Sequence, residues 1–161
     1  MLTSRRGSAA VQFALAAPVF LLLLCAVIEN GIILFSQSLL DEATRDAARL
    51  IQTGQVQQGG GVAAFSAQLC TDLGSYIPCG SLQYNVQSGS SFASLNVTIT
   101  TNSSGNMTNT GFDPGNPQDD VAVQVGYNRS FIIPWLGNVI GTTGGTLLVS
   151  TVIFQNEPFI P

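Results

Sequence analysis

One apolar run near the N-terminus limits what this chain can fold into more than any other feature. Residues 8–28 read SAAVQFALAAPVFLLLLCAVI, and only Gln12 and Pro18 interrupt their apolar character. An α-helix rises about 1.5 Å per residue, so about twenty such residues cross a hydrocarbon layer of roughly 30 Å. We therefore expect a membrane-spanning helix here, followed by a domain outside the bilayer.

Composition argues against several classes of function. The 161 residues include nine acidic and five basic side chains and no histidine, for a net charge of −4. The basic residues are scattered arginines, so no basic patch is available to neutralise the phosphates of a nucleic acid. Histidine is the commonest general base and the commonest metal ligand. We therefore expect no nucleic-acid partner, no enzymatic activity, no cofactor and no metal site.

The charges that flank the apolar run predict its orientation and a processing site. Arg5 and Arg6 precede the run and Glu29 follows it, which places the N-terminus in the cytoplasm. A signal-peptide cleavage motif, residues 14–16, lies inside the run, where such a site does not belong. A lipoprotein site needs a small residue before its cysteine, but Leu24 precedes Cys25. Of the processing sites considered, this leaves cleavage before the apolar run, at Gly7.

The residues around Gly7 resemble the start of type IV prepilins. Gly7 ends a short basic leader, Ser8 would be the first mature residue, and Gln12 and Phe13 follow as the polar fifth and aromatic sixth residues. The segment GSAAVQFALAAPVFLLLL is similar in particular to TadE/TadG-like pseudopilins of the tight-adherence, Flp-type pilus system. Those sequences usually read G-x-x-A-V-E-F-A-L-x-x-P, so Gln12 stands where the family usually has Glu.

The resemblance implies a structural subunit of a pilus. It implies cleavage by a prepilin peptidase between Gly7 and Ser8, and packing of the apolar helix against other pilins and pseudopilins. It also implies a bacterial inner-membrane protein whose C-terminal domain lies in the periplasm, or on the pilus or cell surface after assembly. Because Gln12 carries no charge, we expect a minor subunit that initiates or caps a fibre. The alternative is a single-span, membrane-anchored periplasmic binding or interaction domain.

The remaining chain predicts a stalk and a small domain. Helical spacing continues through Leu39, Leu40, Ala43, Ala47, Leu50 and Ile51. We therefore expect a leader at 1–7, a transmembrane and stalk helix at 8–53 and a Gly/Gln linker at 54–61. The domain at 62–161 begins with an amphipathic helix that ends at Gly74. Cys70 and Cys79 should be oxidised outside the cytoplasm, the alternative being two free thiols.

Alternating apolar residues predict strands at 82–86, 95–99 and 121–127, and an apolar run predicts another at 146–154. Residues 101–120 are polar and rich in Asn, Gly and Pro, so we expect a long exposed loop. Asp113, Asp119 and Asp120 supply oxygen ligands in this region, but they lack the spacing of a calcium loop. The predicted fold is α+β, with a long N-terminal transmembrane helix, about four antiparallel strands and one covering helix.

Overall fold

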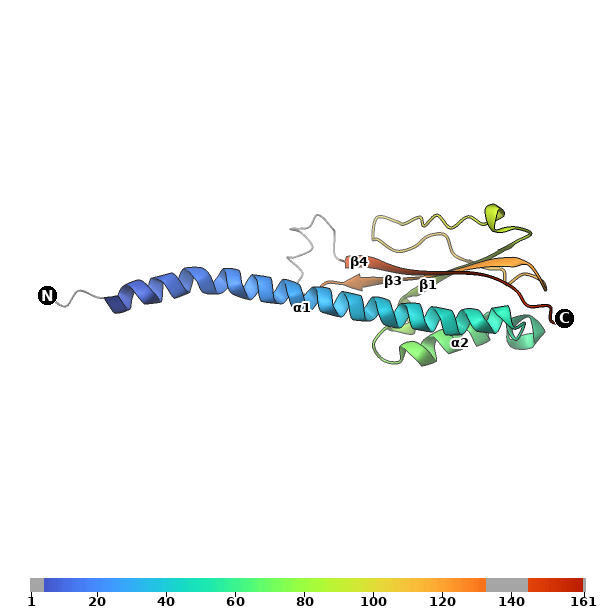
Figure 1. Ribbon diagram of the computed structural model, residues 1–161, viewed down its shortest axis with the longest axis horizontal. Coiled ribbons are helices and arrows are strands. Elements are labelled where there is room, and N and C mark those ends of the chain that lie inside the picture. The colour runs from blue at the N-terminus through green and yellow to red at the C-terminus, as the bar shows by residue number, and fades with distance from the viewer. Residues whose placement is uncertain (1–4, 133–144, 161) are drawn as a thin grey trace. The chain divides into compact units, whose positions relative to one another are not determined.

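The computed structural model describes residues 5–132 and 145–160 (Figure 1). Contacts divide the chain into two compact units, Met1–Leu34 and Phe35–Pro161. The elements in chain order are α1 (Arg5–Gln52), η1 (Val56–Gly60), α2 (Gly61–Leu73), η2 (Cys79–Ser81), β1 (Leu82–Gly89), η3 (Phe92–Ser94), β2 (Gly111–Phe112), β3 (Asp120–Ser130) and β4 (Gly145–Gln155). The predicted α+β class, with a long apolar helix, four strands and a further helix, is confirmed.

The first unit consists of helix α1 alone, as far as the structure describes it. Pro18 lies inside the helix. A proline removes one backbone hydrogen bond, and a helix in a membrane or a bundle tolerates this where neighbours or local adjustment satisfy the freed carbonyl. The side chains from Ala9 to Leu24 are almost all exposed. The first unit therefore has no core of its own.

Two helices cover one face of the sheet in the second unit. Leu40, Ala43, Ala47 and Ile51 of α1 are almost fully buried, and their spacing is that of one helical face. Phe65, Leu69 and Leu73 form the buried face of α2. The ring of Phe65 lies 5.5 Å from that of Tyr84 and 5.4 Å from that of Phe112. These contacts bury the valines of β3 beneath the helices, and Figure 1 shows α2 on the same side of the sheet as this part of α1.

The sheet is mixed, which corrects the prediction of an antiparallel one. Its strand order is β2-β1-β3-β4. β1 and β3 pair in antiparallel fashion from Leu82↔Tyr127 to Gly89↔Asp120, and β3 and β4 pair likewise along their length. β2 pairs with β1 in parallel, through Asn85↔Gly111 and Val86↔Phe112. This short strand lies within the stretch 101–120, and the strand predicted at 95–99 is not formed.

The second face of the sheet explains why residues 95–99 do not form a strand. This face carries two buried amides, Asn85 and Gln124, which hydrogen-bond to each other at 3.2 Å. The Gln124 side chain also donates to the carbonyl of Val97 at 2.8 Å. Buried amides need such partners. The segment between β1 and β2 therefore crosses this face as a cover, above the strands in Figure 1, and does not extend the sheet.

The C-terminal residues close over the end of α1. The backbone N–H of Glu157 donates to the carbonyl of Gln52 at 2.9 Å. Gly54 is buried with φ of 80°, a left-handed conformation that favours glycine after a helix. The Phe159 ring lies so close to Gly54 that a Cβ there would overlap it. The tail thus packs on a helix end that only glycine can form.

We expect Gly54→Ala to destabilise the second unit more than Gly74→Ala does. Both glycines follow helices and have positive φ, but a Cβ at Gly74 would meet nothing within 4 Å. Gly74→Ala should therefore cost about 1–2 kcal/mol for backbone strain alone. Gly54→Ala should cost about 2–5 kcal/mol, because overlap with Phe159 is added. Urea unfolding of the full chain in detergent measures both, and equal losses would contradict the packing of Phe159 on Gly54.

Candidate functional site

The apolar surface of α1 in the first unit is the candidate functional site. Its exposed side chains include Phe13 (74%), Phe20 (63%) and Val27 (72%). The helix has one candidate membrane span, Ala9–Gln52, and no residue of its most apolar window is buried. A soluble monomer rarely exposes so long an apolar surface. The surface therefore needs lipid or another apolar helix to cover it.

The predicted processing residues lie at the beginning of this helix. Arg5, Arg6, Gly7 and Ser8 belong to the first turns of α1. Gln12 and Phe13 follow, and both side chains are exposed. Gln12 is the one polar side chain between Ala9 and Ile28. If another apolar helix covered this region, the amide of Gln12 would need a hydrogen-bond partner from that neighbour.

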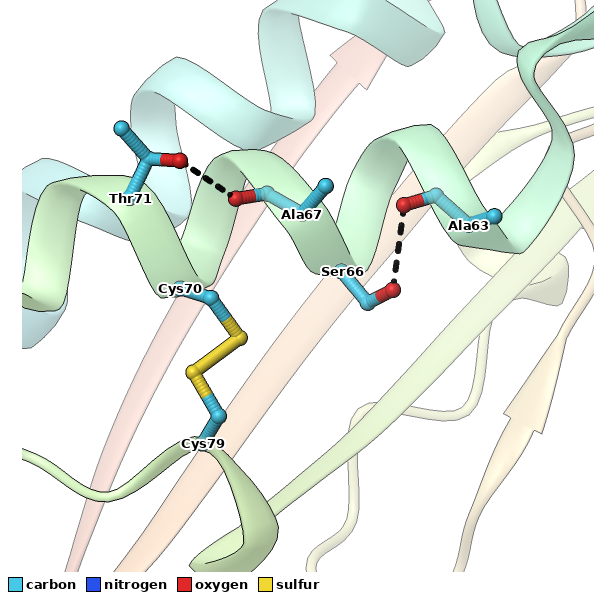
Figure 2. Close-up of a disulfide and its surroundings, with 6 residues drawn as sticks. All are labelled: Ala63, Ser66, Ala67, Cys70, Thr71 and Cys79. Carbon is cyan, nitrogen blue, oxygen red and sulfur yellow. Dashed lines mark hydrogen bonds between the residues drawn. A yellow bond between two sulfur atoms is a disulfide. The ribbon is translucent and has the colours of Figure 1, made fainter.

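A disulfide joins Cys70 of α2 to Cys79 at the start of η2 (Figure 2). Their Cα atoms are 5.5 Å apart. The loop that they close contains Ile77, which is buried, and Tyr76, whose exposed fraction is 72%. The third cysteine, Cys25, is free and partly exposed. The bond therefore fixes the connection between α2 and β1 to the body of the second unit.

Two aspartates of the second unit hold turns, and one of its pockets has a neutral polar lining. Asp113 accepts hydrogen bonds from Ser88 and from the N–H of Gly115, and Asp119 accepts one from the N–H of Asn116. No group of three metal-ligating side chains forms within 5–132 and 145–160. A pocket of about 660 Å³ near the start of β1 is lined by serine, asparagine, glutamine and glycine alone. Such a lining offers no charged group to act as acid or base.

One surface feature, the contact between Phe35 and Tyr76, could not be predicted from the sequence. Their ring centroids are 5.6 Å apart in an edge-to-face arrangement, and both side chains are exposed. The two residues lie far apart in the chain, so periodicity contains no sign of the contact. The sequence feature closest to this contact is the stretch 73–84, which carries no charged side chain and contains Tyr76.

Comparison with known proteins identifies the N-terminal part of the chain. A family model for TadE-like proteins matches residues 7–49, so the resemblance predicted from the sequence is confirmed over that range. The match begins at Gly7 and ends within α1, before any of the strands. No curated protein and no solved structure is significantly similar to the chain. The match therefore makes residues 7–49 similar to TadE-like proteins of the tight-adherence pilus system.

We expect the full chain to gain one thiol adduct when it is alkylated under denaturing, non-reducing conditions, and three after reduction. The single adduct should map to Cys25, which is the free cysteine. Intact mass followed by peptide mapping measures this. Three adducts without reduction would contradict the bond. Replacing Cys70 and Cys79 by Ser should lower the free energy of unfolding by about 2.5–3 kcal/mol, because the open loop gains chain entropy. Cys25→Ala is the matched control, and it should leave the stability of the second unit unchanged.

Proposed function

We propose that this protein is a minor pseudopilin, a structural subunit that takes part in assembling or capping a tight-adherence type IV pilus. The observation that carries the proposal is the start of the family match at Gly7, where the basic leader meets the apolar helix. The exposed apolar surface of α1 supports it, because a subunit of a fibre needs such a surface for its neighbours. Its partners are then other pilins and pseudopilins, a prepilin peptidase and the inner membrane.

The proposed topology places the N-terminus in the cytoplasm and the second unit in the periplasm. Arg5 and Arg6 support this orientation because positive charge stays on the cytoplasmic side. The disulfide between Cys70 and Cys79 supports it independently, because such bonds persist in oxidising compartments. The second unit carries the sheet and both termini of the disulfide loop, so the whole unit would face that compartment.

The proposed mechanism is assembly. The protein inserts through its apolar helix, and a prepilin peptidase then cuts between Gly7 and Ser8. The cut removes Arg5 and Arg6 and leaves a new α-amino group that is mostly charged at neutral pH. Without the two charged arginines, the apolar helix can transfer from the bilayer into contact with the helices of other subunits. The second unit then remains exposed on the assembled fibre.

Gln12 supports a place at the end of a fibre. In an apolar helix bundle an unpaired charge is costly, so a charged N-terminal amine needs a carboxylate nearby. Gln12 can accept a hydrogen bond from such an amine, but its amide cannot cancel the charge. A subunit with no neighbour ahead of it needs no carboxylate at this position. We therefore assign this protein to the initiation or the cap of the fibre.

N-terminal sequencing of membrane-extracted protein should begin at Ser8 in cells that have a functional prepilin peptidase. Gly7→Val should block the cut, because a peptidase of this type needs a small residue before the bond. Gly31→Ala is the matched control, since it changes a glycine of the same helix where a Cβ would meet nothing within 4 Å. Mature protein that retains residues 1–7 beside an active peptidase would overturn the proposal and favour a membrane-anchored interaction domain.

The placement at a fibre end has its own test in sheared and purified fibres. Quantitative mass spectrometry should find the wild-type protein far below the major pilin. Gln12→Glu should increase its share, because the carboxylate could then neutralise the amine of a neighbouring subunit. Gln12→Asn is the control, since it keeps a neutral amide. Wild-type protein as abundant as the major pilin would disprove the placement but not the membership of the fibre.

A further inference from the structure

We propose that the polar pocket near the start of β1 binds a neutral saccharide. The pocket has a volume of about 660 Å³, which is within the range of about 300–1,000 Å³ for small-ligand sites. Its lining residues lie between Gly80 and Ser130, so all of them belong to the second unit. The site therefore depends neither on how the two units are arranged nor on the proposed place in a pilus.

The two strands that line the pocket present it on the face of the sheet away from α2. The ring of Tyr84 contacts Phe65 of α2, so Gln83, the preceding residue of β1, points to the other face. Gln83 pairs with Gly126 of β3, and side chains of a strand alternate between its faces. Asn128 and Ser130 therefore share the face of Gln83. The strands supply one side of the pocket from backbone that both pairings hold in place.

A tight turn at residues 102–106 supplies another side of the pocket. Asn102 Oδ1 accepts hydrogen bonds from the N–H groups of Ser104 and Asn106, at 3.0 Å each. The amide nitrogen of Asn128 donates to the carbonyl of Ser104 at 2.7 Å and to Asn106 Oδ1 at 3.1 Å, which ties the turn to β3. Gly105 has φ of 76°, and a Cβ there would lie 3.3 Å from that nitrogen. The turn is thus ordered before a ligand arrives, and a pre-ordered site loses less entropy on binding.

Several polar groups of the lining are available to a ligand. Within residues 5–132 and 145–160, no hydrogen bond uses the amide nitrogen of Asn106, the amide oxygen of Asn128 or the hydroxyls of four lining serines, Ser81, Ser103, Ser104 and Ser130. A serine hydroxyl both donates and accepts, and an asparagine amide offers a donor beside an acceptor. The hydroxyls around a sugar ring also both donate and accept, so a saccharide matches this set of groups.

The same lining disfavours the other common classes of ligand. None of the described residues that form it is charged, so a phosphate or carboxylate would meet no cation, and a divalent cation would meet no carboxylate. The lining also contains no aliphatic or aromatic side chain, so a bound peptide would find no apolar subsite for its side chains. The net charge of −4 further disfavours an acidic sugar. A neutral saccharide is the class that remains.

Saturation-transfer difference NMR of the full chain tests the site in a phosphocholine detergent, which carries no sugar headgroup. The probes are glucose, galactose and mannose, each compared with its own uronic acid. We expect at least one hexose to bind, and its uronic acid to bind at least about tenfold more weakly, because the carboxylate would be desolvated without a partner. Absence of binding by all three hexoses would overturn the inference. A uronic acid that binds as tightly as its hexose would overturn it as well.

Serine substitutions locate the binding. The double variants Ser103→Ala/Ser104→Ala and Ser81→Ala/Ser130→Ala should each weaken hexose binding by about tenfold, because each removes two hydroxyls from the lining. Both should keep the wild-type stability, because within the described residues these hydroxyls make no hydrogen bond to the protein. Ser75→Ala is the matched control, an exposed serine outside the pocket, and it should leave binding unchanged. Binding that both double variants retain in full would place the sugar elsewhere and refute the site.

Discussion

The apolar surface at the start of α1 has no cover within its own unit, and the rest of the structure depends on that constraint. Between Ala9 and Leu24 nearly every side chain is exposed, although most are aliphatic or aromatic. Burying one such side chain is worth about 1.5–3 kcal/mol, so the helix is stable only where lipid or other helices surround it. Beyond Leu40 the same helix buries one face in the second unit. Helix α1 thus has an exposed apolar part at its start and a part beyond Leu40 that belongs to the core of the second unit.

The second unit compensates for its small size with local constraints. Its covering helices bury only narrow apolar faces, and the other face of its sheet includes two buried amides, Asn85 and Gln124. The buried side chain of Asn156, which follows β4, donates to the carbonyls of Pro114 and Asn116 at 2.9 Å each. These bonds fix the loop between β2 and β3 to the C-terminal segment. The disulfide and the packing of Phe159 on Gly54 act in the same way. Each of them fixes a connection that has few apolar contacts of its own.

A domain built in this way suits a structural subunit. Its polar pocket and its aspartates contribute hydrogen bonds to turns, and they bring no nucleophile together with a base. What distinguishes the molecule is where its apolar and aromatic groups remain exposed. Many of these groups lie along the start of α1, and others, such as Phe35, Tyr76 and Phe92, lie in the second unit. The proposed function of the start of α1 follows from contact with lipid and with other helices.

The sequence by itself determined the features that depend on neighbouring residues. The apolar run, the helix that ends near Gly54 and the three longer strands were predicted because their periodicity and end signals are local. The tertiary structure decided the short parallel strand at Gly111, the course of residues 95–99 and the contact of Phe35 with Tyr76. Alternation at Leu95 and Val97 was a true local pattern, but Gln124 required a partner on the same face of the sheet. Such a requirement arises only between residues distant in the chain, so no local pattern reveals it.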